Sequence, residues 1–173
     1  MSNHIADQAL SRIDIGAPLW KTLVVLASAE TDAASGLIWH AWTRIEDWPS
    51  MSPLVVAARW TNGQPWRVGS EFVQELNLGF PFRNRATAER VASVEPGVAI
   101  EWGSDSRGLR RVHLWRLENL DGGGCRITSV AVFHGSFIGV VKHIVAKRWQ
   151  QMFQAQIDGL INLARENARN LDE

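Results

Sequence analysis

The chain has 173 residues, of which 46% are hydrophobic and 21% charged, a composition typical of one folded domain that buries roughly 70% of its unfolded surface. Lysine plus arginine equals aspartate plus glutamate at 18 each, and this balance argues against a nucleic acid or an anionic membrane as partner, because clustered positive charge holds both. The single cysteine, Cys125, excludes an internal disulfide and a cysteine-based metal cluster.

The ends of the chain and its hydropathy indicate its compartment. No apolar run approaches the roughly 18 residues of a membrane span, and the start of the chain lacks the basic and apolar segments of a signal peptide. We therefore expect no membrane span and a cytoplasmic protein. Residues 1–20 predict an arm or a short helix, residues 21–169 a single domain, and residues 170–173 a tail.

The first predicted elements are one strand and two short helical pieces. Residues 22–31 alternate in polarity and are rich in β-branched side chains, so they predict a strand. Residues 33–42 carry apolar side chains at helical spacing and predict a helix. The segment 47–50 is expected to break this helix, and residues 50–54 allow one further turn, limited by Pro53.

Six more strand-like runs follow at short intervals. Glycine, proline and asparagine separate them, and these short turns leave no room for the crossovers that a parallel sheet needs. The runs cover residues 55–61, 70–78, 83–92, 98–103, 109–120 and 125–134. We therefore predict an antiparallel meander.

The carboxy-terminal part of the chain predicts one long helix over residues 138–169. Apolar side chains recur there in steps of three and four, which places them on one stripe, and the opposite face is polar. The stripe comprises Val141, Ile144, Val145, Trp149, Met152, Phe153, Ile157, Leu160, Ile161 and Ala164. A helix about 45 Å long is expected to lie across the sheet.

This order of elements and several short local sequences resemble the START-like (SRPBCC) superfamily, in particular its polyketide cyclase/dehydrase and lipid-transport branch. The matching segments are Ile38-Trp39, Asp47-Trp48-Pro49-Ser50-Met51-Ser52-Pro53, Val68-Gly69-Ser70-Glu71-Phe72, Ile100-Glu101-Trp102, His113-Leu114-Trp115-Arg116-Leu117 and Phe133-His134-Gly135. The resemblance implies an α+β helix-grip fold. In it, a curved antiparallel sheet of six or seven strands, with two short helices after the first strand, holds the long carboxy-terminal helix around a hydrophobic cavity.

Strand alternation assigns side chains to the two faces of the sheet. For the last two strands, an odd-length glycine loop with Asp121 opposite Cys125 points His113 and Trp115 inward, whereas a four-residue loop would reverse the relation between these strands. With the odd loop, four apolar side chains lie on the outer face: Val112, Leu114, Val130 and Val132.

Nine tryptophans and no tyrosine indicate an aromatic interior. The rings either form a close-packed core or line a ligand pocket. In the pocket interpretation, the ligand-binding candidates are Trp60, Phe72, Leu76, Trp102, His113, Trp115, Phe133, Arg148, Trp149, Met152 and Phe153.

His113 is the ionisable group that we expect in the apolar interior. It is either a catalytic or ligand-binding residue, able to hydrogen-bond a carbonyl or move a proton, or a neutral core histidine. Arg148 either meets an anionic ligand group or flanks the apolar stripe with its charge in solvent. No metal and no cofactor are expected, because no carboxylate completes a histidine cluster at ligand spacing and no nucleotide-binding motif is present.

Two functions are compatible with these residues. The first is binding of a hydrophobic or aromatic small molecule, lipid-like or polyketide-like, in an internal cavity between the helix and the sheet. The alternative, which the resemblance implies, is a polyketide cyclase or dehydratase-type enzyme without a metal, in which His113 assists enolisation or loss of water. The apolar outer face also allows a homodimer surface.

Overall fold

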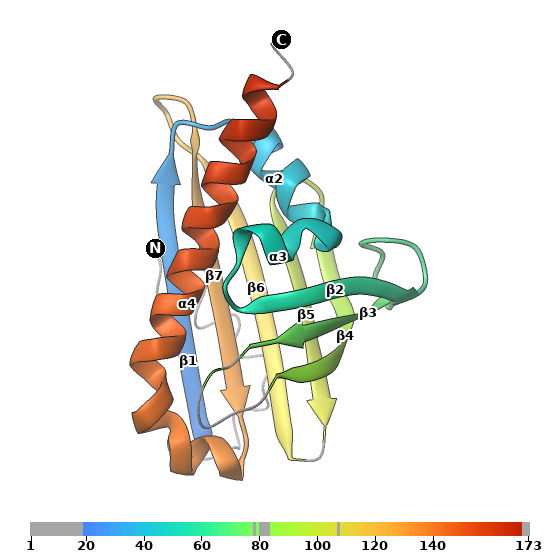
Figure 1. The fold of residues 1–173 in the computed structure, drawn as a ribbon, viewed down its shortest axis with the longest axis vertical. Helices are drawn as coiled ribbons and strands as arrows, with labels where there is room; N and C mark the ends of the chain where they lie inside the picture. Colours follow the sequence, from blue (N-terminus) through green and yellow to red (C-terminus); the bar gives the residue numbers. More distant parts are fainter. Residues whose placement is uncertain (1–18, 78, 80–83, 107, 171–173) are drawn as a thin grey trace.

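A computed structural model describes residues 19–77, 79, 84–106 and 108–170. Within these residues, a seven-stranded antiparallel sheet in the order β1-β7-β6-β5-β4-β3-β2 carries the helices on one face (Figure 1). The elements are η1 (Leu19–Lys21), β1 (Thr22–Thr31), α2 (Ser35–Thr43), η2 (Ile45–Asp47), α3 (Trp48–Met51), β2 (Val55–Asn62), β3 (Glu71–Leu76), β4 (Arg85–Glu95), β5 (Ala99–Ser106), β6 (Leu109–Asn119), β7 (Cys125–His134) and α4 (Ser136–Arg169). The predicted helix-grip fold is confirmed.

The bounds of most elements agree closely with those predicted, and the main difference lies after the first helix. We expected residues 47–50 to break the first helix and residues 50–54 to allow one further turn, limited by Pro53, but α2 already ends at Thr43 and α3 covers Trp48–Met51, including Pro49. This prediction was wrong because a proline in the first turn of a helix loses no hydrogen bond. The arm predicted for residues 1–20 and the tail for 170–173 lie mostly outside the described residues, and this division stays a prediction.

The loop between β6 and β7 preserves the predicted faces but not the predicted pairing. Cys125 lies opposite Asn119 rather than Asp121, so the loop has five residues, Leu120 to Gly124. Its length is odd, and His113 and Trp115 therefore share the inner face with their partners on β7, as predicted. The positive φ angles of 88° at Gly123 and 73° at Gly124 turn the chain, and they are favourable for glycine.

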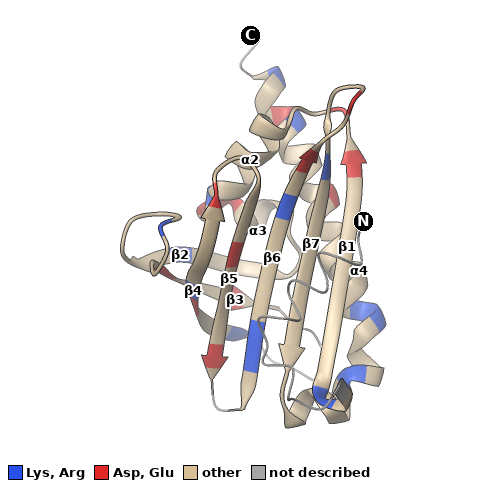
Figure 2. Cartoon of the chain, turned by 180° about the vertical axis from the view of Figure 1, so that it is seen from behind, with Lys and Arg blue, Asp and Glu red and all other residues tan. Residues whose placement is uncertain are grey.

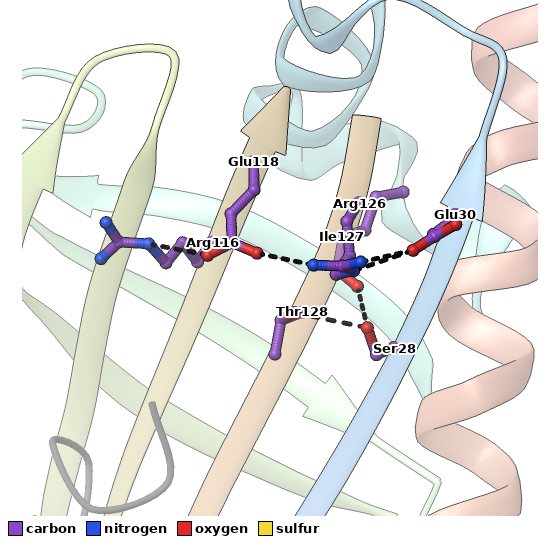
Figure 3. A network of polar contacts seen from close by, with 7 residues as sticks. All are labelled: Ser28, Glu30, Arg116, Glu118, Arg126, Ile127 and Thr128. Carbon is purple, nitrogen blue, oxygen red and sulfur yellow. Dashed lines mark hydrogen bonds and ion pairs between the residues drawn. The ribbon is translucent and has the colours of Figure 1, made fainter. Parts of the chain in front are cut away.

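A polar network on the outer face ties three strands together in this register. Arg126 of β7 donates to Glu30 of β1 at 2.6 Å and pairs with Glu118 of β6 at 3.4 Å (Figure 3). Glu30 and Glu118 are its cross-strand partners in the ladder. A shift of either strand by one residue would turn these side chains to the opposite face, so the network favours the observed pairing.

The apolar side chains predicted on the outer face are found there. Val112, Leu114, Val130 and Val132 form a small cluster, and they are only 0–8% exposed. The open apolar surface that prompted the dimer hypothesis is therefore not present at these four residues, and a homodimer stays a prediction.

The long helix α4 lies over the inner face alongside β1, with α2 and α3 packed beside it (Figure 1). Gly159 allows this close approach, because a Cβ atom there would overlap the backbone carbonyl of Met51. One member of the predicted buried stripe is misplaced: Ile144 is 73% exposed. At about 100° per residue, it falls beyond the edge of the face that Val141 and Val145 bury. No helix among the described residues is long and apolar enough to span a membrane.

Candidate functional site

The inner face of the sheet carries a row of polar side chains under the helices. Arg111 and His113 alternate with outward apolar residues along β6, and both are buried. Gln74 occupies the inner face of β3 between Phe72 and Leu76, and it is also buried. The candidate site is thus a polar patch inside an otherwise apolar interior.

Tryptophan rings from α2, α3 and the sheet fill one end of this interior. The ring of Trp42 is stacked between Trp48, at a centroid distance of 4.6 Å, and Trp115, at 3.7 Å. Trp102 lies about one ring width away, 5.8 Å from Trp48 and 6.0 Å from Trp42. Two rings of the predicted aromatic lining, Trp102 and Trp115, therefore pack against other tryptophans.

A cavity of about 20 Å³ lies between the sheet and α4. It is lined by Trp48, Leu54, Val55, Gln74, Leu76, Trp102, Arg111, His113, Phe133, Phe153 and Gln156. This volume is enough for about one water molecule and is far below the roughly 300–1,000 Å³ of ligand pockets. Among the described residues, the cavity at this place is much smaller than the one expected from the sequence.

A buried ion pair lies at the edge of the cavity. The guanidinium of Arg111 contacts the carboxylate of Glu89 on β4, with side chains only 8% and 0% exposed. Arg111 Nη2 also donates to Thr87 Oγ1 at 3.1 Å. Burial lowers the pKa of Arg111 to about 10, so the guanidinium is still charged at neutral pH. The guanidinium therefore lines the cavity with its charge balanced by the carboxylate of Glu89.

His113 is held in one neutral tautomer by its neighbours. Trp115 Nε1 donates to His113 Nε2 at 2.9 Å, and the Ser129 hydroxyl lies 2.9 Å from the same nitrogen. Because an indole N–H can only donate, Nε2 is the acceptor and the proton is on Nδ1. Burial, and then the charge of Arg111, lower the pKa of His113 well below its ordinary value.

The walls of the cavity carry polar atoms that lack hydrogen-bond partners. Among the described residues, Arg111 Nε, Trp102 Nε1 and Gln156 Oε1 are buried and have none. His113, whose Nδ1–H is a further donor, also lines the cavity. Buried polar groups are usually satisfied, so a concentration of unpaired donors is typical of a place where water or a ligand binds.

Several of the predicted site residues meet at the cavity. Leu76, Trp102, His113, Phe133 and Phe153 line it. Five others surround it without lining it: Phe72, Trp115 and Trp149 are buried, and Trp60 and Met152 are partly buried against the core. Arg148 is exposed on α4, against Gly79, and does not line the cavity.

Sequence reasoning missed the polar members of the site. Arg111 precedes His113 by two residues, Gln74 lies between two inward residues, and Gln156 follows Phe153 by three on the helix. The same periodicities that placed their apolar neighbours would have placed them inside. The prediction named the apolar residues and His113 on these faces and left these three polar positions out.

The described residues give little support to a metal site or to a cysteine nucleophile. No group of three possible metal ligands occurs in the part of the chain that the structure describes. Cys125 is buried, and burial raises the pKa of its thiol, which disfavours the thiolate that a nucleophile requires.

A comparison with known protein families finds the family that the local sequences resemble. A family model described as polyketide cyclase/dehydrase and lipid transport matches residues 22–165. The chain belongs to this family. The match covers every strand and nearly all of α4, so the whole site lies within the family domain. Among curated proteins, no sequence matches.

Solved structures show the same fold at low sequence identity. The protein TTHA0849 from Thermus thermophilus is 13% identical with a TM-score of 0.70, over 84% of this chain and 99% of that one. Ara h 8.0201 is 13% identical with a TM-score of 0.65, over 84% and 99%. Norcoclaurine synthase from Thalictrum flavum is 16% identical with a TM-score of 0.62, over 84% and 87%. At such low sequence identities, the similarity shows only that these proteins share the fold.

Proposed function

We propose that this protein binds an apolar or aromatic small molecule that carries an oxygen acceptor. The observation that carries the proposal is the pair of donors without partners at the cavity, Arg111 Nε and Trp102 Nε1, with the Nδ1–H donor of His113 in the same lining. A carbonyl or carboxylate oxygen placed there would accept from them. The family's association with polyketides and lipids agrees with such a ligand.

The apolar part of the ligand would lie between the sheet and α4. Leu76, Phe133 and Phe153 line that side of the cavity and offer only carbon surface. Because the cavity holds about one water, the ligand has to displace some of these side chains, and the energy of this rearrangement lowers the affinity. Burial of apolar surface at about 25 cal/mol per Å² supplies the driving force.

Calorimetric titration with two matched planar probes tests the proposal. Anthraquinone has carbonyl oxygens and anthracene has none, while their ring systems are alike. We expect anthraquinone to bind about tenfold or more tightly, because an unmet buried donor costs about 1–3 kcal/mol. Trp102→Phe keeps a ring but removes the indole N–H, so it should reduce this preference.

The matched control is Trp39→Phe, which changes a partly buried indole that does not line the cavity. Its preference for anthraquinone should equal that of the unchanged protein. If neither probe binds, and a fatty acid such as oleate also fails to bind, the protein is not a carrier of apolar molecules. Equal affinity for the two probes would instead mean that the unpaired N–H donors at the cavity do not contribute to binding.

The enzyme alternative is a cyclase or dehydratase in which His113 acts on a bound ketone. The Nδ1–H tautomer favours a role as a hydrogen-bond donor to a carbonyl oxygen over a role as a base, because Nε2 is already occupied. In that case His113→Gln should lower turnover much more than affinity. Equal losses of both would favour the binding function. A cytoplasmic location stays a prediction from the sequence.

A further inference from the structure

The first three turns of α4 present apolar side chains to solvent. Phe137, Val140 and Ile144 are 54%, 74% and 73% exposed. Their spacing of three and four places them on one stripe, beside the face that Val141 and Val145 bury against the sheet. Exposed leucine-sized side chains are common singly, but a contiguous row marks an interaction surface.

Trp20 extends this stripe from the neighbouring end of β1. Trp20 is 57% exposed, and its ring lies against Gly139, where a Cβ atom would come within 2.7 Å of the ring. The ammonium of Lys21 lies 4.9 Å from the centre of the same ring. Trp20, Phe137, Val140 and Ile144 together form the surface that we call the α4 patch.

The charged residues of the described segments that carry the α4 patch are of one sign. Lys147 and Arg148 follow Ile144 by one turn and are exposed, and Lys21 flanks Trp20. Residues 19–29 and 136–157 contain no aspartate or glutamate. Figure 2 shows basic residues along the beginning of α4 and at the start of β1. The neutral total charge of the chain conceals this local excess.

We propose that the α4 patch docks onto the surface of a lipid bilayer that contains anionic lipids. An aromatic ring and aliphatic side chains can enter the boundary between headgroups and acyl chains, and flanking lysine and arginine attract the anionic headgroups. A second copy of the chain fits less well, because two identical basic patches would face and repel each other. This docking does not depend on the interior cavity.

Flotation with vesicles of phosphatidylcholine, with or without phosphatidylglycerol, tests this surface. We expect the protein to float with the mixed vesicles and to be released by high salt, which screens the attraction. Ile144→Asp should reduce binding about tenfold by removing apolar insertion, and Lys147→Glu about fivefold or more. Val68→Asp and Arg67→Glu change exposed residues of the same types in the β2–β3 loop and should have no effect.

Fluorescence quenching by brominated lipids gives an independent readout. Trp20 is the exposed tryptophan of the patch, so the quenching should be largely lost in Trp20→Phe. The proposal is overturned if the protein binds neither kind of vesicle, or if Ile144→Asp and Lys147→Glu bind like their controls. It is also overturned if Ile144→Asp abolishes a concentration-dependent dimer in sedimentation and leaves vesicle binding unchanged, since the patch would then join two copies. Failure of the calorimetric titrations would not affect any of these outcomes.

Discussion

The buried ion pair between Arg111 and Glu89 allows a quantitative test of the interior. In Arg111→Met, the carboxylate of Glu89 loses the cation beside it while staying buried, since its side chain is 0% exposed. Removing one partner of a buried pair costs about 3–5 kcal/mol, because the remaining charge is desolvated without compensation. That is a large part of the roughly 5–15 kcal/mol by which a domain of ordinary stability is folded.

Urea unfolding at neutral pH, followed by far-ultraviolet circular dichroism, measures this loss. With a slope of about 2 kcal/mol per M, the midpoint should fall by about 2 M. Glu89→Leu should be destabilised similarly, because it leaves the guanidinium of Arg111 buried without its partner. The double variant removes both charges, and we expect it to recover most of the stability, with a coupling energy of several kcal/mol.

The double variant also separates stability from binding. It should fold, yet it lacks the Arg111 Nε donor, so its preference for anthraquinone over anthracene should be smaller than that of the unchanged protein. This expectation is contradicted if the losses of the two single variants simply add in the double variant. Additive losses would mean that the two charges do not stabilise each other in the folded protein.

The other predictions concern pH and packing. The pKa of His113 is lowered in the folded state, so as the pH falls the histidine takes up a proton in the unfolded chain first. The free energy of unfolding should therefore fall by roughly 1.4 kcal/mol per pH unit as the pH drops below about 6.5. His113→Gln should lose this component of the slope in unfolding titrations at a series of pH values, and an unchanged slope would contradict the assignment. Gly159→Ala should cost about 1–3 kcal/mol in thermal unfolding, because its Cβ meets the backbone of Met51, whereas Gly36→Ala in α2 has open space and should stabilise by about 0.5–1 kcal/mol. Trp42→Ala removes the ring between two stacked neighbours, and it should cost about 3–5 kcal/mol and reduce the near-ultraviolet circular dichroism. Intact near-ultraviolet signal in a folded variant would argue against the stack.

The sequence alone determined the order of the elements and the faces of the strands. Alternation in β6 and β7 placed His113, Trp115 and the outward valines correctly, although the residue predicted opposite Cys125 was Asp121 and the residue found there is Asn119. The reason is that period two makes faces depend only on whether the loop length is odd or even. The helical stripe of α4 was likewise predictable, apart from Ile144 at its edge.

Only the tertiary structure decided how much space is left inside and which polar groups meet there. The cavity is small because α2 and α3 bring Trp42 and Trp48 onto the sheet, and their placement depends on long-range packing. Arg111 reaches Glu89 across β5, where the small Ser104 lies opposite Arg111. Local periodicity specifies the direction of a side chain relative to its own element. Volumes and ion pairs depend on how separate elements dock, and this requires coordinates.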